Sequence, residues 1–304
     1  MTEHVRIGTR GSPLALAQAH ETRARLMAAH DMPEDAFEIV VIKTTGDAVL
    51  DRPLGEIGGK GLFTKEIEDA MLDGSIHLAV HSMKDMPVDQ PEGLVLDCFL
   101  PREDVRDAFV SHNFGSIADL PKGAKLGSSS LRRRAQILNR RPDLEVVEFR
   151  GNVQTRMRKL EDGVADATFL AMAGLNRLGM AHHAKCAIEV NELLPAVAQG
   201  AIGIERRIDD KRIADMLAAI NHADTMTRLT VERSYLRALD GSCQTPIAGL
   251  AILEDDQVML RGEILRPDGS EAVQGKMSGP ASQGAEIGQK LAEDLLGKSG
   301  GGFF

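Results

Sequence analysis

The sequence predicts an α/β fold over its first two-thirds and a small α+β domain after it. Short β-rich runs alternate with helical patterns up to about residue 220, which is typical of a parallel sheet covered by helices. From about Asn221 the order changes to a helix, three β-rich runs and a closing helix. At roughly 150 residues per domain, 304 residues correspond to about two domains, and three small ones also fit.

The first α/β unit opens with a strand-to-helix junction. Ser12 and Pro13 are typical of an N-cap and a first helical residue, and the helix should end near His30. A glycine-rich stretch, GEIGGKG, precedes a second helix with one apolar face, formed by Phe63, Ile67, Ala70 and Met71. We expect strands at residues 5–9, 37–44 and 77–82.

The second α/β unit begins near Arg102 and contains a similar junction. A strand runs into consecutive serines, and Leu131, Ala135 and Leu138 share one face of the next helix. Asn152 caps a further helix, whose inward residues should be Val153, Met157 and Leu160. We expect strands at residues 108–111, 145–150 and 166–171, and one that enters residues 127–130. The shared junction suggests a duplication, without a detectable sequence repeat.

The C-terminal part should form the α+β domain. A helix reaches Leu239, a Gly-Ser-Cys loop follows, and strands are expected at residues 246–253, 257–265 and 271–277. A helix near residues 285–296 closes the domain, and the tail GKSGGGFF is expected to be mobile.

Charge and composition exclude several function classes. The net charge of −9 and the absence of Trp argue against a nucleic-acid-binding protein, which would be basic and rich in stacking platforms. No apolar run approaches the roughly 18 residues of a membrane span, and the N-terminus lacks a signal-peptide core, so we expect a cytoplasmic protein. Cys98, Cys186 and Cys243 share no metal-type spacing and cannot all pair.

Positive charge is nevertheless concentrated around two predicted helix starts. Arg132, Arg133 and Arg134 lie in the first turn of one helix, where cations oppose the helix dipole. Arg150 ends a strand and Arg156 lies early in the next helix, so this group could bind carboxylates or phosphates through bidentate bonds. The alternative is a solvated basic face.

Other motifs are weaker. GEIGGKG is not a P-loop, because Leu54 and Gly61 replace the required glycine and hydroxyl residue; it could present Lys60 to an anion or form a plain turn. His77 and His81 lie about 13 Å apart on a strand, too far for one metal ion, which favours structural roles. Asp85, just beyond that strand, is either a catalytic carboxylate or a solvated turn residue.

The three cysteines differ in their surroundings. Cys98 lies in an apolar run and should be buried, and Cys186 has no recognisable partner. Cys243 occupies a loop of small and polar residues, where a thiol can be exposed and reactive. Spacing alone leaves a functional and a plain loop role open for it.

Ten motifs together resemble the porphobilinogen deaminase family, also called hydroxymethylbilane synthases. They occur in the family's order over about residues 5–250: RIGTRGSPLALAQA, TTGD, GGKGLFTKEIE, AVHSMKDMP, REDVRDAFVS, GSSSLRRRAQ, FRGNVQTR, LAMAGLNRLG, LPAVAQGAIGIE and GSCQTPIAG.

The resemblance implies two doubly wound domains of periplasmic-binding-protein type, with a cleft between them, plus the C-terminal α+β domain. Domain 1 would comprise residues 1–99 and 200–220, domain 2 residues 100–199, and domain 3 residues 221–304. It also implies a dipyrromethane cofactor, held by a thioether to Cys243, onto which porphobilinogen units condense with loss of ammonia. Water then releases the linear tetrapyrrole hydroxymethylbilane.

The resemblance further implies site residues. Asp85 matches the catalytic aspartate. The residues of this chain at family positions that bind the cofactor are Asp47, Ser82, Lys84, Ser128, Ser130, Arg132, Arg133, Arg156 and Gln199. Positions that bind substrate match Arg10, Ser12, Lys60, Phe63, Arg150 and Arg177. The expected partners are porphobilinogen and the growing polypyrrole, with no metal, nucleic acid or membrane, and the chain should be monomeric. Glu56 replaces a lysine found in many relatives.

Two rival classes share the predicted fold. A solute-binding protein for small anions would need export, for which no signal sequence is seen, and would leave Cys243 unexplained. A transcriptional regulator would need a basic helix-turn-helix segment, and none is recognisable. The residues therefore favour the deaminase.

Overall fold

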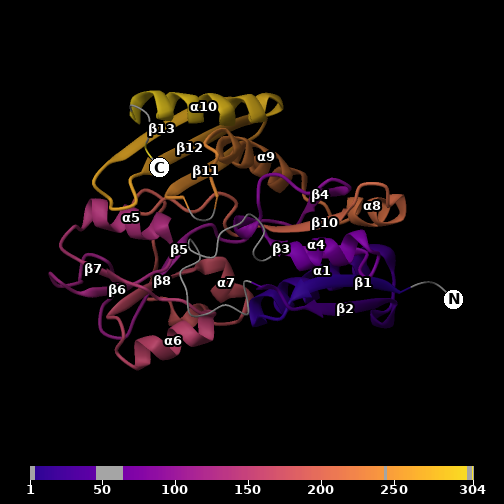
Figure 1. Ribbon diagram of the computed structural model, residues 1–304, viewed down its shortest axis with the longest axis horizontal. Helices are drawn as coiled ribbons and strands as arrows, with labels where there is room; N and C mark the ends of the chain where they lie inside the picture. Colours follow the sequence, from indigo (N-terminus) through magenta and orange to yellow (C-terminus); the bar gives the residue numbers. More distant parts are fainter. Residues whose placement is uncertain (1–3, 46–63, 243–244, 300–302, 304) are drawn as a thin grey trace. The chain divides into compact units, whose positions relative to one another are not determined.

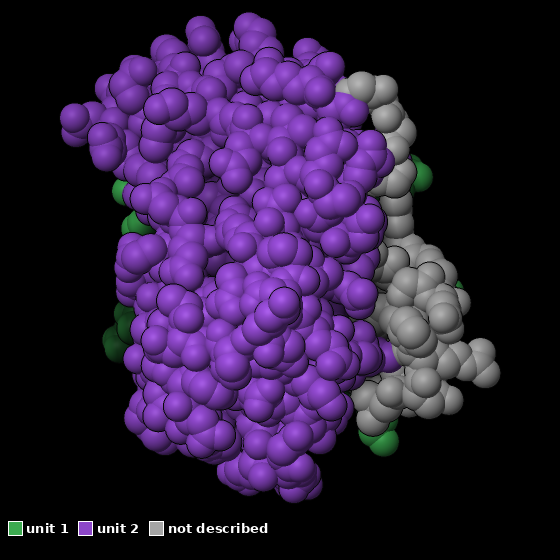
Figure 2. All heavy atoms as spheres, turned by 90° about the vertical axis from the view of Figure 1, so that its left-hand side faces the viewer, with its two compact units in different colours: residues 1–102, 201–226 green, residues 103–200, 227–304 purple. Residues whose placement is uncertain are grey.

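The computed structural model describes residues 4–45, 64–242, 245–299 and 303 (Figure 1). The chain divides into two compact units, each built from two separate stretches of sequence (Figure 2). The first unit comprises Met1–Arg102 and Ala201–Met226, and the second comprises Glu103–Gly200 and Thr227–Phe304.

The first unit contains a five-stranded sheet in the order β2-β1-β3-β10-β4. Its strands are β1 (Val5–Arg10), β2 (Phe37–Ile42), β3 (Leu78–Ser82), β4 (Leu94–Phe99) and β10 (Ile202–Arg207). The first three are parallel, and β10 is antiparallel to both β3 and β4. Helices α1 (Pro13–His30) and α8 (Lys211–Ala218) pack on one face, and α4 (Lys65–Leu72) packs on the other. The short 3₁₀ helices η1 (Glu34–Ala36) and η2 (Met83–Asp85) complete this unit.

The second unit contains a second five-stranded sheet with the same pattern, in the order β7-β6-β8-β5-β9. Its strands are β5 (Asp107–Ser111), β6 (Lys125–Gly127), β7 (Glu145–Val147), β8 (Ala167–Ala171) and β9 (Cys186–Ala187). Here β5 is the antiparallel strand, placed between β8 and β9. The helices are α5 (Leu131–Arg140), α6 (Val153–Glu161) and α7 (Met172–Arg177), followed by η3 (Ala181–His183).

The rest of the second unit is an antiparallel sheet with two long helices. Strands β11 (Ile247–Glu254), β12 (Gln257–Leu265) and β13 (Ala272–Pro280) pair in sequence order. Helix α10 (Gly284–Ser299), which follows η4 (Ala281–Gln283), packs on β12 and β13. Helix α9 is Ala223–Ala238, and it belongs to this unit from Thr227 onward. The expectation of a mobile tail is wrong for Phe303, which is buried beneath the guanidinium of Arg266 at 4.9 Å from its ring centroid.

The predicted α/β fold with a C-terminal α+β part is confirmed. Two details differ. The sheets are mixed rather than parallel, because β10 and β5 each insert in the antiparallel direction. The strand expected at residues 145–150 ends at Val147, since its partner β6 has only three residues. The finer division of the second unit into domains 2 and 3 stays a prediction.

Candidate functional site

The first unit contains a cavity of about 80 Å³ where β1 and β3 end. Arg10 is the last residue of β1, and Ser12 caps α1 by accepting a hydrogen bond from the Ala15 backbone N–H at 3.2 Å. Ser82 ends β3, and Asp85 follows on η2. All four of these site residues line the cavity. Carboxyl ends of parallel strands are the usual place for ligands in such sheets.

The cavity combines a cation, neutral donors and acceptors, and an exposed carboxylate. Gln18 is buried and exchanges two hydrogen bonds with Ser82, with Nε2 to Oγ at 2.8 Å and Oγ to Oε1 at 3.0 Å. The Asp85 side chain is exposed at the cavity. This set suits a small molecule that carries both a carboxylate and an N–H donor.

Two histidines, His77 directly before β3 and His81 on it, have hydrogen-bond partners within the first unit. His81 Nε2 lies 3.0 Å from the carboxylate of Glu205, which is fully buried. His77 Nδ1 accepts a hydrogen bond from the Arg6 backbone N–H at 2.9 Å. Burial raises the pKa of the neighbouring Glu68 carboxyl. Within the described ranges, no group of three His, Cys, Asp or Glu residues could hold a metal ion.

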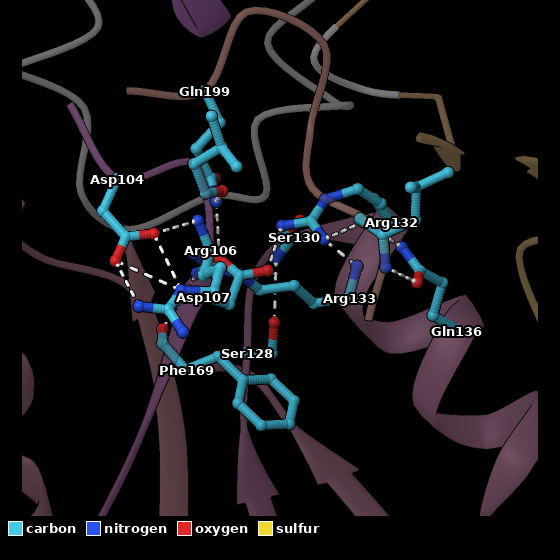
Figure 3. A network of polar contacts seen from close by, with 12 residues as sticks. Asp104, Arg106, Asp107, Ser128, Ser130, Arg132, Arg133, Gln136, Phe169 and Gln199 are labelled. Carbon is cyan, nitrogen blue, oxygen red and sulfur yellow. Dashed lines mark hydrogen bonds and ion pairs between the residues drawn. The ribbon is translucent and has the colours of Figure 1, made fainter. Parts of the chain in front are cut away.

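The second unit places two predicted site residues, Arg132 and Arg133, in a buried ionic network (Figure 3). Both extend from the first turn of α5 toward Asp107, at the start of β5. Arg132 Nη2 and Arg133 Nη2 donate to separate oxygens of Asp107 at 2.8 and 2.6 Å. Arg132 Nη1 also donates to the Leu194 carbonyl, and Arg133 Nη1 to that of Phe169, both at 2.8 Å.

This network changes the interpretation of the arginine run. Arg132 and Arg133 are 4% and 5% exposed, so a solvated basic face is wrong for them, whereas Arg134 is exposed. The buried side of α5 also differs from the predicted one, because both arginines join Ala135 on it. Burial acts to raise the pKa of Asp107, but the two guanidiniums prevail and hold that pKa well below its usual range.

Other predicted cofactor residues lie around the same network. Gln199 Nε2 donates to Asp107 Oδ1 at 2.9 Å and to the Val105 carbonyl at 2.8 Å. The buried Ser128 accepts a hydrogen bond from the Ser130 backbone N–H at 3.2 Å. Ser130 in turn caps α5 by accepting from the Arg133 N–H at 3.4 Å. The triplet of serines therefore shapes the strand-to-helix turn that presents the arginines.

The remaining described candidates lie on helices or in the segment that follows a strand. Arg150 is three residues beyond β7, and its carbonyl accepts from Lys159 Nζ at 3.0 Å. Arg156 lies on α6 and is half-buried. Arg177 ends α7 and donates to the Gly200 carbonyl from both Nη atoms, at 3.2 Å each. Lys84 lies on η2, half-buried.

Several predicted residues fall outside the described ranges: Asp47, Glu56, Lys60, Phe63 and Cys243. Among the other cysteines, Cys98 is buried as predicted, and burial raises the pKa of its thiol to about 12. Burial also raises the pKa of Cys186, which is half-buried. Neither environment favours a reactive thiolate.

Sequence reasoning missed Asp107 and Gln18. Asp107 begins an apolar strand, and an acidic residue at such a position is a signal for a buried ion pair. Gln18 gave no comparable signal, because a glutamine within a long helix is ordinary.

Two family models cover nearly the whole described fold. The porphobilinogen deaminase dipyrromethane cofactor-binding domain matches residues 5–215, and the porphobilinogen deaminase C-terminal domain matches residues 226–297. The chain belongs to the porphobilinogen deaminase family. The first match includes both five-stranded sheets, the cavity and the arginine network, and the second includes Cys243.

Curated relatives agree with this assignment. A porphobilinogen deaminase of Paracoccus denitrificans is 69% identical over 300 residues, which covers 99% of this chain and 96% of that protein. A chloroplastic porphobilinogen deaminase of Oryza sativa is 55% identical, covering 99% of this chain and 85% of that protein.

Among solved structures, a periplasmic substrate-binding protein of Coxiella burnetii is 15% identical, covering 73% of this chain and 94% of that one, with a TM-score of 0.43.

The family carries the dipyrromethane cofactor, and the second unit suits such a group. Two buried guanidiniums share one carboxylate in the network, which leaves an excess of positive charge. Arg132 Nε and Arg133 Nε have no hydrogen-bond partner among the described residues. A group that carries several carboxylates would balance this charge.

Through the described stretches of chain, no helix is long and apolar enough to cross a membrane.

Proposed function

We propose that this chain is a transferase that makes hydroxymethylbilane. It condenses four porphobilinogen units head to tail, with loss of ammonia at each step, on a dipyrromethane attached to Cys243, and releases the product with water. Family membership supports the reaction. The observation that carries the site assignment is the cavity where Asp85 lies with Arg10 and Ser12 at the ends of two strands.

Asp85 is the proposed catalytic residue. When the amino group of the aminomethyl substituent of porphobilinogen leaves as ammonia, its methylene carbon stays on the ring and the pyrrole nitrogen of the substrate gains positive character. A carboxylate that accepts the pyrrole N–H balances this charge, and such electrostatic stabilisation is usually a large part of catalysis. Asp85 is exposed at the cavity, so it can also exchange protons with the substrate.

Arg10 and Ser12 are proposed to bind the acetate or propionate of the incoming substrate. The first supplies a guanidinium, and the second offers a hydroxyl at the start of α1, where backbone N–H groups and the helix dipole favour an anion. The same role is proposed for the remaining cationic substrate positions, Lys60, Arg150 and Arg177, whereas Phe63 is proposed to contact the substrate through its apolar ring.

The dipyrromethane, when bound, supplies the pyrrole carbon to which the first substrate unit is joined. The proposed binding residues are Asp47, Ser82, Lys84, Ser128, Ser130, Arg132, Arg133, Arg156 and Gln199. Because Arg132 and Arg133 are buried, they contribute mainly positive charge and the shape of the strand-to-helix turn. We also propose that the chain acts as a cytoplasmic monomer without nucleic-acid or membrane partners.

Intact-protein mass tests the proposal. The freshly prepared chain should exceed its sequence mass by two pyrrole units, because the cofactor is attached covalently. Cys243→Ser should abolish this excess and the activity. Cys186→Ser is the matched control, since that thiol is half-buried with a raised pKa, and it should keep both. A wild-type mass equal to that of the bare chain in active protein would contradict the attachment of the cofactor to Cys243. The same bare mass in protein without activity would favour a solute-binding role.

A further inference from the structure

We propose that Glu232 is a positioning residue for the arginine network, acting through the backbone of Ala198. This inference rests on the proposed function, which assigns the network to cofactor binding. Glu232 lies on α9 and is fully buried in the second unit. Its carboxylate joins the segment of residues 195–200 to the edge of the C-terminal sheet.

The two oxygens of Glu232 each accept one backbone hydrogen bond. Oε2 accepts from the Ala198 N–H at 2.6 Å, and Oε1 accepts from the Ala251 N–H at 2.8 Å. Ala251 belongs to β11, whose only ladder partner among the described strands is β12. The other edge of β11 would leave its N–H groups unpaired, but Glu232 accepts from Ala251 and the Pro195 carbonyl accepts from Gly249 at 3.1 Å.

Ala198 requires such an anchor because its backbone is strained. Its φ of 61° lies in the left-handed region, which costs a residue with a side chain free energy and is found mainly where the surroundings enforce it. The Gln199 N–H closes a turn onto the Ala196 carbonyl at 3.0 Å. Gly200 follows with φ of 87°, where an added Cβ would lie 2.6 Å from the Glu103 carbonyl oxygen.

This strained turn bears, directly or through a partner, on four proposed site residues: Gln199, Arg132, Arg133 and Arg177. Gln199 extends from it to Asp107, which in turn holds Arg132 and Arg133. The Gly200 carbonyl accepts both hydrogen bonds from Arg177. If residue 198 relaxed out of the left-handed region, the direction of residues 199 and 200 would change. Glu232 therefore acts at a distance on groups assigned to cofactor and substrate.

The chemistry requires a carboxylate at this position. Two N–H donors face two acceptor oxygens, and a glutamine has only one acceptor oxygen, so its NH₂ group would face a backbone N–H. Glu263 provides a matched control for the rate of cofactor attachment, because it is equally buried in the same unit but contacts Arg140 and Gln274 instead of residues 195–200. Its charge also acts on Arg132, so the arginine signals of Glu232→Gln are compared with wild type and with the double variant.

The test compares Glu232→Gln, Glu263→Gln, Ala198→Gly and the double variant Ala198→Gly/Glu232→Gln. Apoprotein of each is incubated with porphobilinogen, and the rate of cofactor attachment is followed by intact mass. Loss of a charge-assisted hydrogen bond at a buried site should slow attachment about tenfold in Glu232→Gln. Glu263→Gln should stay within about twofold of wild type. Ala198→Gly should restore the double variant, because glycine adopts positive φ without a side-chain penalty.

A second measurement does not depend on cofactor chemistry. In ¹⁵N-labelled apoprotein, the Nε–H signals of Arg132 and Arg133 should shift in Glu232→Gln and return in the double variant. Unchanged signals in Glu232→Gln, or equal effects of Glu232→Gln and Glu263→Gln on the rate of cofactor attachment, would overturn the inference. If wild type acquires no cofactor, the proposed function fails, and the arginine signals still decide the role of Glu232. Should Glu232→Gln not fold, Glu232→Asp, which is one methylene too short to reach both N–H groups, replaces it.

Discussion

The two five-stranded sheets share one strand order and differ in where they place their acids. In the first sheet, β10 lies antiparallel to β3 and pairs Ile202 with Ser82. In the second, β5 lies antiparallel to β8 and pairs Asp107 with Ala171 at the corresponding position. An apolar residue in one sheet thus corresponds to a fully buried carboxylate in the other.

The proposed catalytic acid of the first unit is on the turn after its strand. Asp85 follows β3 on η2 and is exposed at a cavity, whereas Asp107 is enclosed by two guanidiniums. The difference teaches that one topology can hold a carboxylate available to substrate or a carboxylate that holds structure. Burial and neighbouring charge distinguish the two roles.

The largest expected effect is on the stability of the second unit. Asp107→Asn leaves two buried guanidiniums without a counter-charge, which should lower the free energy of unfolding by about 3–5 kcal/mol. Urea denaturation monitored by circular dichroism measures it. Asp85→Asn, at an exposed carboxylate, is the comparison and should change stability little. Similar stabilities for the two variants would remove the distinction drawn between these acids.

The same ion pairs predict a pH dependence. The pKa of Asp107 is lowered in the folded protein, so its stabilisation is complete above the unfolded-state value near 4 and is lost as pH falls below it. Wild-type stability should therefore decline below about pH 4, and Asp107→Asn should lack that component.

Asp85→Asn should have the next largest effect, on catalysis in the first unit. Removing the charge while keeping the size should slow ammonia release about 10²-fold or more, because the positive pyrrole nitrogen loses its counter-charge. Single-turnover ammonia release at saturating porphobilinogen measures it. Glu92→Gln, at an exposed carboxylate between η2 and β4, is the control and should retain normal release. Near-normal release from Asp85→Asn would place the catalytic carboxylate elsewhere.

The smallest expected effect tests the shared strand-to-helix junction. Ser12 and Ser130 cap α1 and α5 in the same way, so Ser12→Ala and Ser130→Ala should each cost about 1 kcal/mol of unfolding free energy. Ser12→Ala should also raise KM for porphobilinogen, because that serine lines the cavity. Threonine variants keep the capping oxygen and serve as controls. If either alanine variant were as stable as wild type, the two junctions would not be equivalent.

The sequence by itself determined the local structure and the family. Caps and apolar periodicity depend on residues a few positions apart, and they placed α1 and α6 correctly: Ser12 and Asn152 both cap their helices as expected. The motifs identified the family because they extend through most of the chain. Strand ends were less predictable, since a strand continues only where a partner strand exists, as β6 and β7 show.

Only the tertiary structure decided the surroundings of Arg132, Arg133 and Glu232. No helical periodicity marks Arg132 and Arg133 as inward-facing, because a buried cation is tolerated only beside a counter-charge. Their carboxylate is about 25 residues away in the sequence, at Asp107. Likewise, Glu232 meets Ala198 across 34 positions. Such pairs form only after strands and helices have packed, so the physical reason for each charged residue's burial lies in contacts that no local pattern encodes.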